Sequence, residues 1–309
     1  MTERPPLTVI LSTHVSLEGM EIVGILERHK RLMRAYAESL TVHVYSSDAK
    51  DYSARLGVAH HPAGWLSRRK GIGHAYYFVW LVLQARSMRG VIKVFGSNIP
   101  TLPLVRRLSG RPMMVTYQWD YARGTAMNEP RSFRGWVAPF LERCALARAD
   151  LVLVTTSWLE ERVRTRYRKE TVLLPNWVEL NRSAPREEER EAGLILFAGR
   201  LHWIKGADLL VSAFADLGTE HPGARLLVCG EGDERSRLEE MRRARSLSRV
   251  EIPGPLPQAE IFRLMERASI FVLPTLTMEG HPKALVEAMS AGAACVVSDV
   301  PGMEMVRDG

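Results

Sequence analysis

Short apolar runs alternate with longer amphipathic stretches along most of the chain. A run at residues 7–12 is followed by an amphipathic stretch at 22–40 and by an alternating run at 41–46. A strand, a helix and a second strand in this order indicate a parallel sheet, because parallel strands need a crossover connection. The next predicted strands are 91–95, 113–117, 151–155 and 172–174, with helices at 75–88, 102–108 and 136–148 and a basic, irregular stretch at 60–73.

The same alternation begins again at Leu194, after a charged run at 186–191 that we interpret as a linker. Two series of this kind predict two domains, 1–184 and 185–309, and 309 residues are enough for two hydrophobic cores. The second series has strands at 194–197, 226–229, 249–252, 270–273 and 295–298, and helices at 207–217, 235–246, 258–268 and from Pro282 to Gly292.

The most informative stretch joins the strand 270–273 to the helix that starts at Pro282. Proline is favoured as a first helical residue because its missing N–H has no partner there. Glu279 falls on the connecting loop and Glu287 on the helix. Ligands of open parallel sheets bind at the carboxyl ends of strands, and a helix start attracts phosphate. Two carboxylates at this place would accept hydrogen bonds from sugar hydroxyls.

A second group of polar residues follows the strand 194–197. Arg200 and Lys205 stand between Gly199 and Gly206, at another junction of strand and helix. Fixed cations at such a junction attract an anionic group. Arginine offers a planar fork and lysine a point charge.

Three motifs together resemble the group 1, or family-four, retaining glycosyltransferases. The run E-G-H-P-x4-E-A-M at 279–289 is similar to the family pattern E-G-F-P/G-x4-E-A-M, with His281 in place of the aromatic residue. The run G-R-L-x3-K-G at 199–206 matches the family pattern. The run P-N-W-V-E at 175–179 resembles P-N-G-V-D, with Trp177 replacing the glycine.

The resemblance implies the α/β architecture called GT-B, with two Rossmann-like, doubly wound parallel-sheet domains facing across a cleft. The first domain would receive the acceptor and the second would bind the donor. The implied reaction moves a hexose from a UDP- or GDP-hexose to a glycan or lipid-linked acceptor, with retention, in cell-surface polysaccharide or glycoconjugate synthesis. The donor is a substrate and no cofactor is implied. No D-x-D triplet occurs, so no metal bound by that motif is expected, and no nucleic-acid partner is expected.

The resemblance also implies roles for individual residues. Arg200 and Lys205 would hold the pyrophosphate, Glu279 the sugar hydroxyls and Glu287 the ribose. The resemblance also makes Gln118 and Asp120 catalytic candidates, because they follow the strand whose end often carries a histidine that touches the transferred sugar in related enzymes. A purely structural role for both stays open. The donor-binding set is Gly19, Gly199, Arg200, Lys205, Gly230, Gly254, Glu279, Gly280, His281, Pro282, Lys283, Ala284, Leu285 and Glu287.

Charge is distributed unevenly between the halves. Residues 1–184 hold 27 Lys and Arg against 15 Asp and Glu, a balance of +12, and residues 185–309 have a balance of −5. Isolated cysteines and the absence of a signal peptide predict a cytoplasmic protein. The clusters 68–70 and 106–107 flank the apolar run 75–83, which predicts peripheral attachment to the inner face of the plasma membrane. The alternative is a solvated basic face.

Other functions stay open. A sugar-nucleotide epimerase of the same fold would bind a similar donor without an acceptor. A non-catalytic nucleotide-sugar-binding protein would bind it without turnover. A nicotinamide dehydrogenase is the weakest of these alternatives, because the glycine fingerprint expected near the start of such an enzyme is absent. Family members extend beyond the D-G pair found here at 308–309, which predicts a sheet without its edge strand, marginal stability and weak activity.

Overall fold

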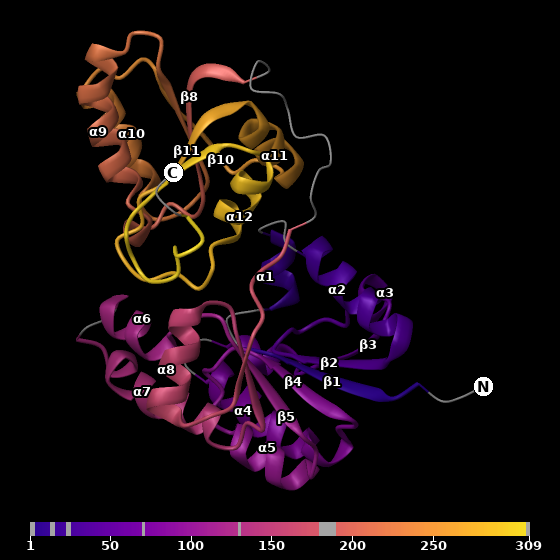
Figure 1. The fold of residues 1–309 in the computed structure, drawn as a ribbon. Coiled ribbons are helices and arrows are strands. Elements are labelled where there is room, and N and C mark those ends of the chain that lie inside the picture. Colours follow the sequence, from indigo (N-terminus) through magenta and orange to yellow (C-terminus); the bar gives the residue numbers. More distant parts are fainter. Residues whose placement is uncertain are drawn as a thin grey trace. The chain divides into compact units, whose positions relative to one another are not determined.

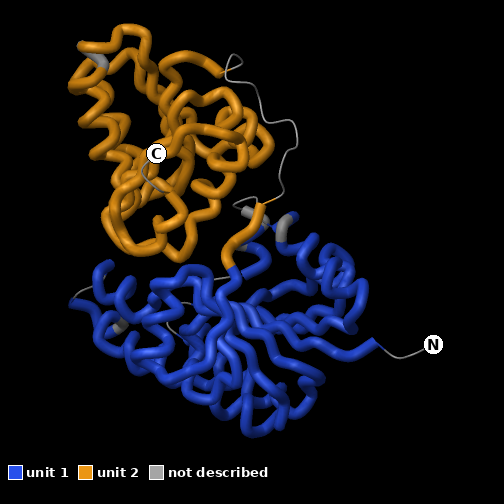
Figure 2. Tube along the Cα trace, in the orientation of Figure 1, with its two compact units in different colours: residues 1–174 blue, residues 175–309 orange. Residues whose placement is uncertain are grey.

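The computed structural model describes residues 4–12, 16–22, 26–69, 72–128, 131–178 and 190–306. The chain divides into two compact units, 1–174 and 175–309 (Figure 2). This division lies ten residues before the boundary expected from the sequence. Most of the expected linker 186–191 lies outside the described residues, and its last residue, Glu191, already begins a strand.

Unit 1 is built on a seven-stranded parallel sheet with the order β3-β2-β1-β4-β5-β6-β7 (Figure 1). The first strand, β1, lies inside the sheet and pairs with β2 on one side and with β4 on the other, and all pairs are parallel. The strands are β1 (Pro6–Leu11), β2 (Thr41–Ser46), β3 (Ala59–Pro62), β4 (Val91–Phe95), β5 (Met113–Tyr117), β6 (Leu151–Val154) and β7 (Thr171–Leu173).

Two hydrophobic cores lie on the two faces of this sheet, because successive side chains of a strand point to opposite faces. Val9 and Leu11 of β1 belong to one core, and Ile10 belongs to the other. The first core is completed by α1 (Leu17–Ile22), α2 (Leu26–Ser39) and α3 (Ser53–Leu56). The second is completed by α4 (Gly73–Gln84), α5 (Leu102–Ser109), α7 (Phe133–Ala147) and α8 (Ser157–Tyr167), and α6 (Tyr121–Asn128) packs on α7.

Unit 2 has a five-stranded parallel sheet with the order β10-β9-β8-β11-β12 around a single core. In both sheets the first strand is internal, and the order in which later strands are added reverses there, as in Rossmann-like sheets. The strands are β8 (Glu191–Ala198), β9 (Arg225–Cys229), β10 (Val250–Gly254), β11 (Ala268–Leu273) and β12 (Ala294–Val297). The helices are α9 (Ala207–Glu220), α10 (Arg235–Ala244), α11 (Gln258–Arg267) and α12 (Lys283–Ser290).

The sequence did not predict several elements of unit 1. The stretch 60–73, interpreted as irregular, contains most of strand β3 and a 3-10 turn at Trp65–Arg68. Helices α3, α6 and α8 were also missed. β3 and α3 have only four residues each, and such short segments carry no detectable hydrophobic period.

Candidate functional site

The glycines of the sequence motifs lie together at the carboxyl edge of the unit 2 sheet. Gly199 directly follows β8, Gly230 follows β9, and Gly254 ends β10. The N–H of Gly199 donates to the carbonyl of Cys229 at 3.0 Å, and the N–H of Gly230 donates to the carbonyl of Gly254 at 3.0 Å. Three neighbouring strand ends are therefore tied in a row, where a ligand of a parallel sheet binds.

Lys205 closes a 3-10 turn at Trp203–Lys205, immediately before α9. Gly206 takes φ +66°, and a Cβ there would lie 2.1 Å from the carbonyl oxygen of Pro274. Only glycine fits this approach. The carbonyl of Ile204 also accepts the N–H of Leu276 at 2.7 Å. The loop after β8 is thus fastened to the loop after β11.

Glu279 lies in the loop after β11 and is 6% exposed. Its Oε1 contacts the ammonium of Lys205 in an ion pair and accepts the hydroxyl of Thr275 at 3.0 Å. Its N–H donates to the carbonyl of Pro301 at 2.8 Å. The structure therefore places the two motifs in direct contact, although 74 positions separate Lys205 from Glu279.

Arg200 is exposed in the turn that follows Gly199. None of the other described residues forms an ion pair with it. An arginine without an acidic partner at a strand end keeps its five donors available for an anion. The site thus combines one cation already paired with a carboxylate and one cation that is unpaired within the described part of the chain.

The helix α12 begins at Lys283, and Pro282 is its N-cap with φ −65° and ψ 121°. The sequence placed Pro282 one residue further in, as the first helical residue, and this was wrong. Its extended ψ explains the difference, because the helical ψ starts only at Lys283. At the other end Gly292, with φ +75°, follows the helix as expected.

His281 has a positive φ of +72°, which is uncommon for a residue with a side chain. The side-chain amide of Asn176 donates to its carbonyl at 2.6 Å and holds this conformation. Burial lowers the pKa of the His281 imidazole from its usual value of 6.5, and Glu304 opposes the shift. Burial thus favours the neutral form of His281 at the entrance to α12.

Glu287 is half-buried on α12, where the side-chain amide of Gln258 donates to its Oε1 at 3.0 Å. Gly280, Lys283 and Ala284 lie between the two glutamates and are all partly exposed. Leu285 differs from these, because its side chain is fully buried in the core and its N–H donates to the carbonyl of Pro282 at 3.2 Å. The side chain and the N–H of Leu285 are therefore both occupied within the protein and do not contact a ligand at this edge.

The remaining candidates belong to unit 1. Gln118 is exposed after β5. Asp120 is fully buried: its Oδ1 accepts the N–H of Arg123 at 2.8 Å, and its Oδ2 lies 2.5 Å from Nε of Arg162. Asp120 thus caps α6 and neutralises a cation, the structural role that the sequence left open.

Gly19 lies within α1 instead of in a loop. The carboxylate of Asp48, which is fully buried, accepts the N–H of Leu17 at 3.0 Å and that of Glu18 at 3.1 Å. An internal anion therefore occupies the helix start where the resemblance implied a donor diphosphate.

Sequence reasoning missed four residues that hold the site: Thr275, Gln258, Asn176 and Gly302. Gly302 has φ +97°, and a Cβ added there would lie 1.9 Å from the carbonyl oxygen of Glu279. The lack of a side chain therefore lets these two segments pass close together. Asn176 lies in the P-N-W-V-E motif, and its place there could have indicated it. No sequence signal points to Thr275 or Gln258, because their partners are known only from the folded chain.

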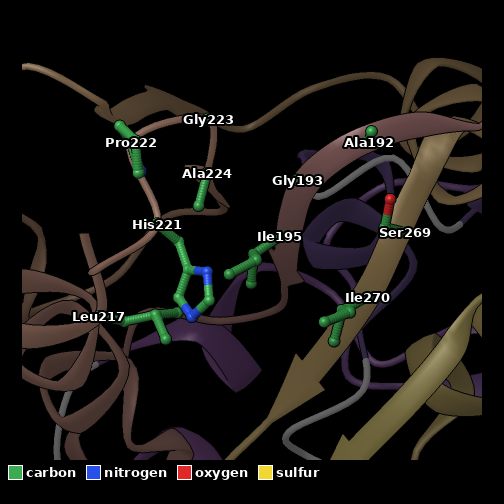
Figure 3. A pocket seen from close by; sticks show the side chains of 10 residues that line it. All are labelled: Ala192, Gly193, Ile195, Leu217, His221, Pro222, Gly223, Ala224, Ser269 and Ile270. Carbon is green, nitrogen blue, oxygen red and sulfur yellow. The ribbon is translucent and has the colours of Figure 1, made fainter. Parts of the chain in front are cut away.

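Three further features concern described residues outside the motifs. No group of three or more His, Cys, Asp or Glu side chains in the described ranges could hold a metal ion. No described helix is long and apolar enough to cross a membrane. A cavity of about 500 Å³ opens at the amino-terminal edge of the unit 2 sheet, where His221 points toward Ile195 and Ile270 (Figure 3). It lies at the edge opposite to the motif residues.

Comparison with known proteins gives one family match. Residues 181–309 match the model of the glycosyl transferases group 1. The gpi3 subunit of phosphatidylinositol N-acetylglucosaminyltransferase from Schizosaccharomyces pombe is 32% identical over 123 residues, which are 40% of this chain and 27% of that protein. A phosphatidyl-myo-inositol mannosyltransferase of Mycolicibacterium smegmatis is 26% identical over 70% of this chain and 55% of that protein. The chain thus spans about a quarter to a half of the length of these relatives.

Solved structures resemble nearly the whole chain. The structure of Anabaena HepE in complex with UDP and glucose matches with a TM-score of 0.72 at 16% identity. The match covers 98% of this chain and 83% of the HepE chain. A sucrose-phosphate synthase from Thermosynechococcus elongatus has a TM-score of 0.76 at 18% identity, with 97% and 83% covered. At these identities the likeness shows the fold, which is GT-B.

Proposed function

We propose that the chain transfers a hexose with retention, because residues 181–309 match the model of the glycosyl transferases group 1 and the fold is GT-B. The donor is a UDP- or GDP-hexose, and the acceptor is a glycan or a lipid-linked glycan. HepE has been solved with UDP and glucose, and the mannosyltransferase relative is named for a lipid acceptor. Both support this choice of substrates.

The observation that carries the proposal is the contact between Lys205 and Glu279 at the carboxyl edge of the sheet. A sugar diphosphate needs a cation for its phosphates and an acceptor for its sugar hydroxyls, a few ångströms apart. The pair supplies both in one place. An arriving donor exchanges the internal ion pair for two contacts, phosphate with Lys205 and hydroxyl with Glu279.

The neighbouring residues complete the donor site. Arg200 is exposed and unpaired among the described residues, so it adds a second cation for the leaving diphosphate. Glu287, turned toward Gln258, accepts from the ribose. The N-terminus of α12 lies between the two glutamates and adds a favourable field for phosphate.

The proposed transfer proceeds by front-face attack. The bond between the anomeric carbon and the diphosphate oxygen breaks, and the acceptor oxygen bonds to the same face of that carbon. The acceptor proton passes to the departing diphosphate oxygen, so atoms and charge balance. Lys205 and Arg200 stabilise the charge that develops on that oxygen. No step requires a metal ion.

The experiment is a screen of UDP- and GDP-sugars for binding and for turnover, with and without glycan and polyprenyl-linked acceptors. We expect nucleoside diphosphate release that depends on the acceptor and a product with the anomeric configuration of the donor. Conversion of the donor sugar without acceptor would instead identify an epimerase. Donor binding without any turnover would identify a non-catalytic sugar-nucleotide-binding protein.

A further inference from the structure

The outer side of α7 carries a stripe of exposed aromatic side chains. Phe133, Trp136 and Phe140 are 75%, 79% and 65% exposed and follow one another at helical spacing. Ser132 fixes the start of the helix, because its hydroxyl accepts the N–H of Gly135 at 2.9 Å. Ala138 on the inner side is fully buried. The stripe is therefore a fixed surface of a folded helix.

The neighbouring helices continue this apolar surface. α5 packs against α7 on one side and against α4 on the other, within one layer on the sheet. α5 exposes Leu104 and Leu108, and α4 exposes Val79 and Leu83. Exposed apolar side chains thus occur on three neighbouring helices of one layer, and such a group marks an interaction surface.

Basic residues outnumber acidic ones in the sequence around α4 and α5. No Asp or Glu occurs between Asp51 and Asp120, whereas that stretch holds ten Lys and Arg. The exposed acid beside α5 is Asp150, whose Oδ2 accepts from Nε of Arg106 at 2.8 Å. On α7, Glu142 is fully buried and Arg143 is exposed.

A basic pocket of about 520 Å³ lies where α5 meets the end of α7. Its charged lining is Arg106, Arg107, Arg148 and Asp150. Arg106 is used by Asp150, but neither Arg107 nor Arg148 has an acidic partner among the described residues. Two unpaired guanidinium groups beside exposed leucines provide a site for one phosphate group next to an apolar phase.

We propose that this surface, the outer residues of α4, α5 and α7, docks on an anionic bilayer, with the aromatic stripe among the lipids and the basic pocket on a lipid phosphate. Aromatic and aliphatic side chains with flanking arginines are the composition of interfacial helices. Two copies of this chain would instead bring like charges together, which disfavours a dimer through this face. The inference deepens the proposed function, because it would present the enzyme to a lipid-linked acceptor.

The test measures sedimentation with vesicles of phosphatidylcholine alone or mixed with phosphatidylglycerol, without donor or acceptor. The full chain should bind the mixed vesicles and bind less as salt rises. Replacing Arg107 and Arg148 with Ser should weaken binding about tenfold or more and flatten the salt dependence, since each basic side chain contributes near the surface. Replacing Phe133, Trp136 and Phe140 with Ser should weaken vesicle binding but leave its dependence on salt unchanged.

Controls separate insertion from misfolding. Trp136→Phe keeps an aromatic side chain and should retain vesicle binding, but should lose part of the tryptophan quenching by brominated lipids. Leu209→Ser and Arg245→Ser, at exposed positions of unit 2, should bind vesicles like the wild type. Wild-type protein that ignores mixed vesicles at low salt would overturn the inference, as would a dimer that dissociates when the stripe is replaced. Vesicle binding does not require sugar transfer. A failure of vesicle binding would therefore not contradict the proposed transferase activity, and an inactive protein could still bind vesicles.

Discussion

At the scale of residues, the site depends on one ion pair that lies mostly out of water. Removing two charges from water costs free energy, and their attraction repays it only with good geometry and further hydrogen bonds. Thr275 supplies such a bond to Glu279. The pair is therefore held in place before any donor arrives, and a donor must offer each partner an equivalent contact.

The first prediction concerns Lys205→Ala. Loss of one charge-assisted contact, worth about 1.5–3 kcal/mol, should weaken binding of UDP or GDP about tenfold to a hundredfold. Turnover should fall as well, because the same cation stabilises the leaving diphosphate. Calorimetry and a rate assay measure both, and Lys50→Ala, an exposed lysine of unit 1, serves as control. Unchanged nucleotide affinity would remove Lys205 from the phosphate site.

The second prediction separates the two glutamates by their partners. Glu279→Gln should depress turnover more than nucleotide affinity, because Glu279 lies beside Lys205, where the sugar is expected. Glu287→Gln should weaken the nucleotide itself, since the residue lies on α12 beside Gln258. Paired titrations and rates measure this, with Glu240→Gln on the surface of α10 as control. Effects in the reverse order would exchange the two assignments.

At the scale of elements, Asp120 joins α6 to α8. It caps α6 through the N–H of Arg123 and pairs with Arg162 of α8 while fully buried. Removing one partner of a buried pair leaves an uncompensated charge, at a cost of about 3–5 kcal/mol. We therefore expect Asp120→Ala to lower the stability of unit 1 by about that amount in urea unfolding.

The exposed Glu38→Ala is the control for Asp120→Ala and should leave the stability of unit 1 nearly unchanged. A stable Asp120→Ala protein that has lost turnover would contradict the structural role. It would restore the catalytic role that the sequence allowed.

A further prediction concerns His60, which connects β3 with β2. Its Nδ1 accepts the N–H of Tyr52 at 3.0 Å, and its Nε2 contacts the hydroxyl of Ser46 at 2.8 Å. Burial lowers the pKa of His60 below its usual 6.5, although Asp48 and Asp51 oppose the shift. The unfolded chain therefore binds a proton more readily, and this group's contribution to stability is present above pH 6.5 and lost as pH falls below it.

His60→Gln should accordingly reduce the loss of unit 1 stability between about pH 7 and pH 5, measured by urea unfolding at intervals of pH. His221→Gln, exposed in unit 2, should leave this dependence unchanged. An identical pH dependence in His60→Gln and the wild type would show that His60 does not contribute to it.

At the scale of the whole molecule, the two units have separate cores and should respond differently to a donor. A nucleotide at about a hundred times its Kd stabilises the part that binds it by about 2.7 kcal/mol. We predict that UDP or GDP raises hydrogen-exchange protection at 199–206 and 279–290 and leaves β1 to β7 nearly unchanged. Protection confined to unit 1 would contradict the placement of the donor site.

The sequence predicted most strands of both sheets to within one to three residues. β4 and β5 begin and end where their apolar runs do, because a buried parallel strand must be largely apolar along its length. β2 coincides with its alternating run. The exceptions are segments whose hydrophobic pattern does not match their surroundings in the folded protein. β3 contains His61, whose ring stacks on His43 and Tyr45, a contact that no periodicity reveals.

The sequence alone determined that Lys205 and Glu279 each follow a strand, because the motif spacing and the apolar runs are local properties. That their side chains form one ion pair was decided by the order β8-β11 in the sheet, which places two distant loops side by side. The same distinction explains Asp120 and Gly19. Their positions after β5 and β1 could be predicted. Arg162, which pairs with Asp120, and Asp48, which accepts from the first N–H groups of the helix that contains Gly19, lie elsewhere in the sequence. Whether a polar residue is available to a ligand depends on such partners, and only packing in three dimensions supplies them.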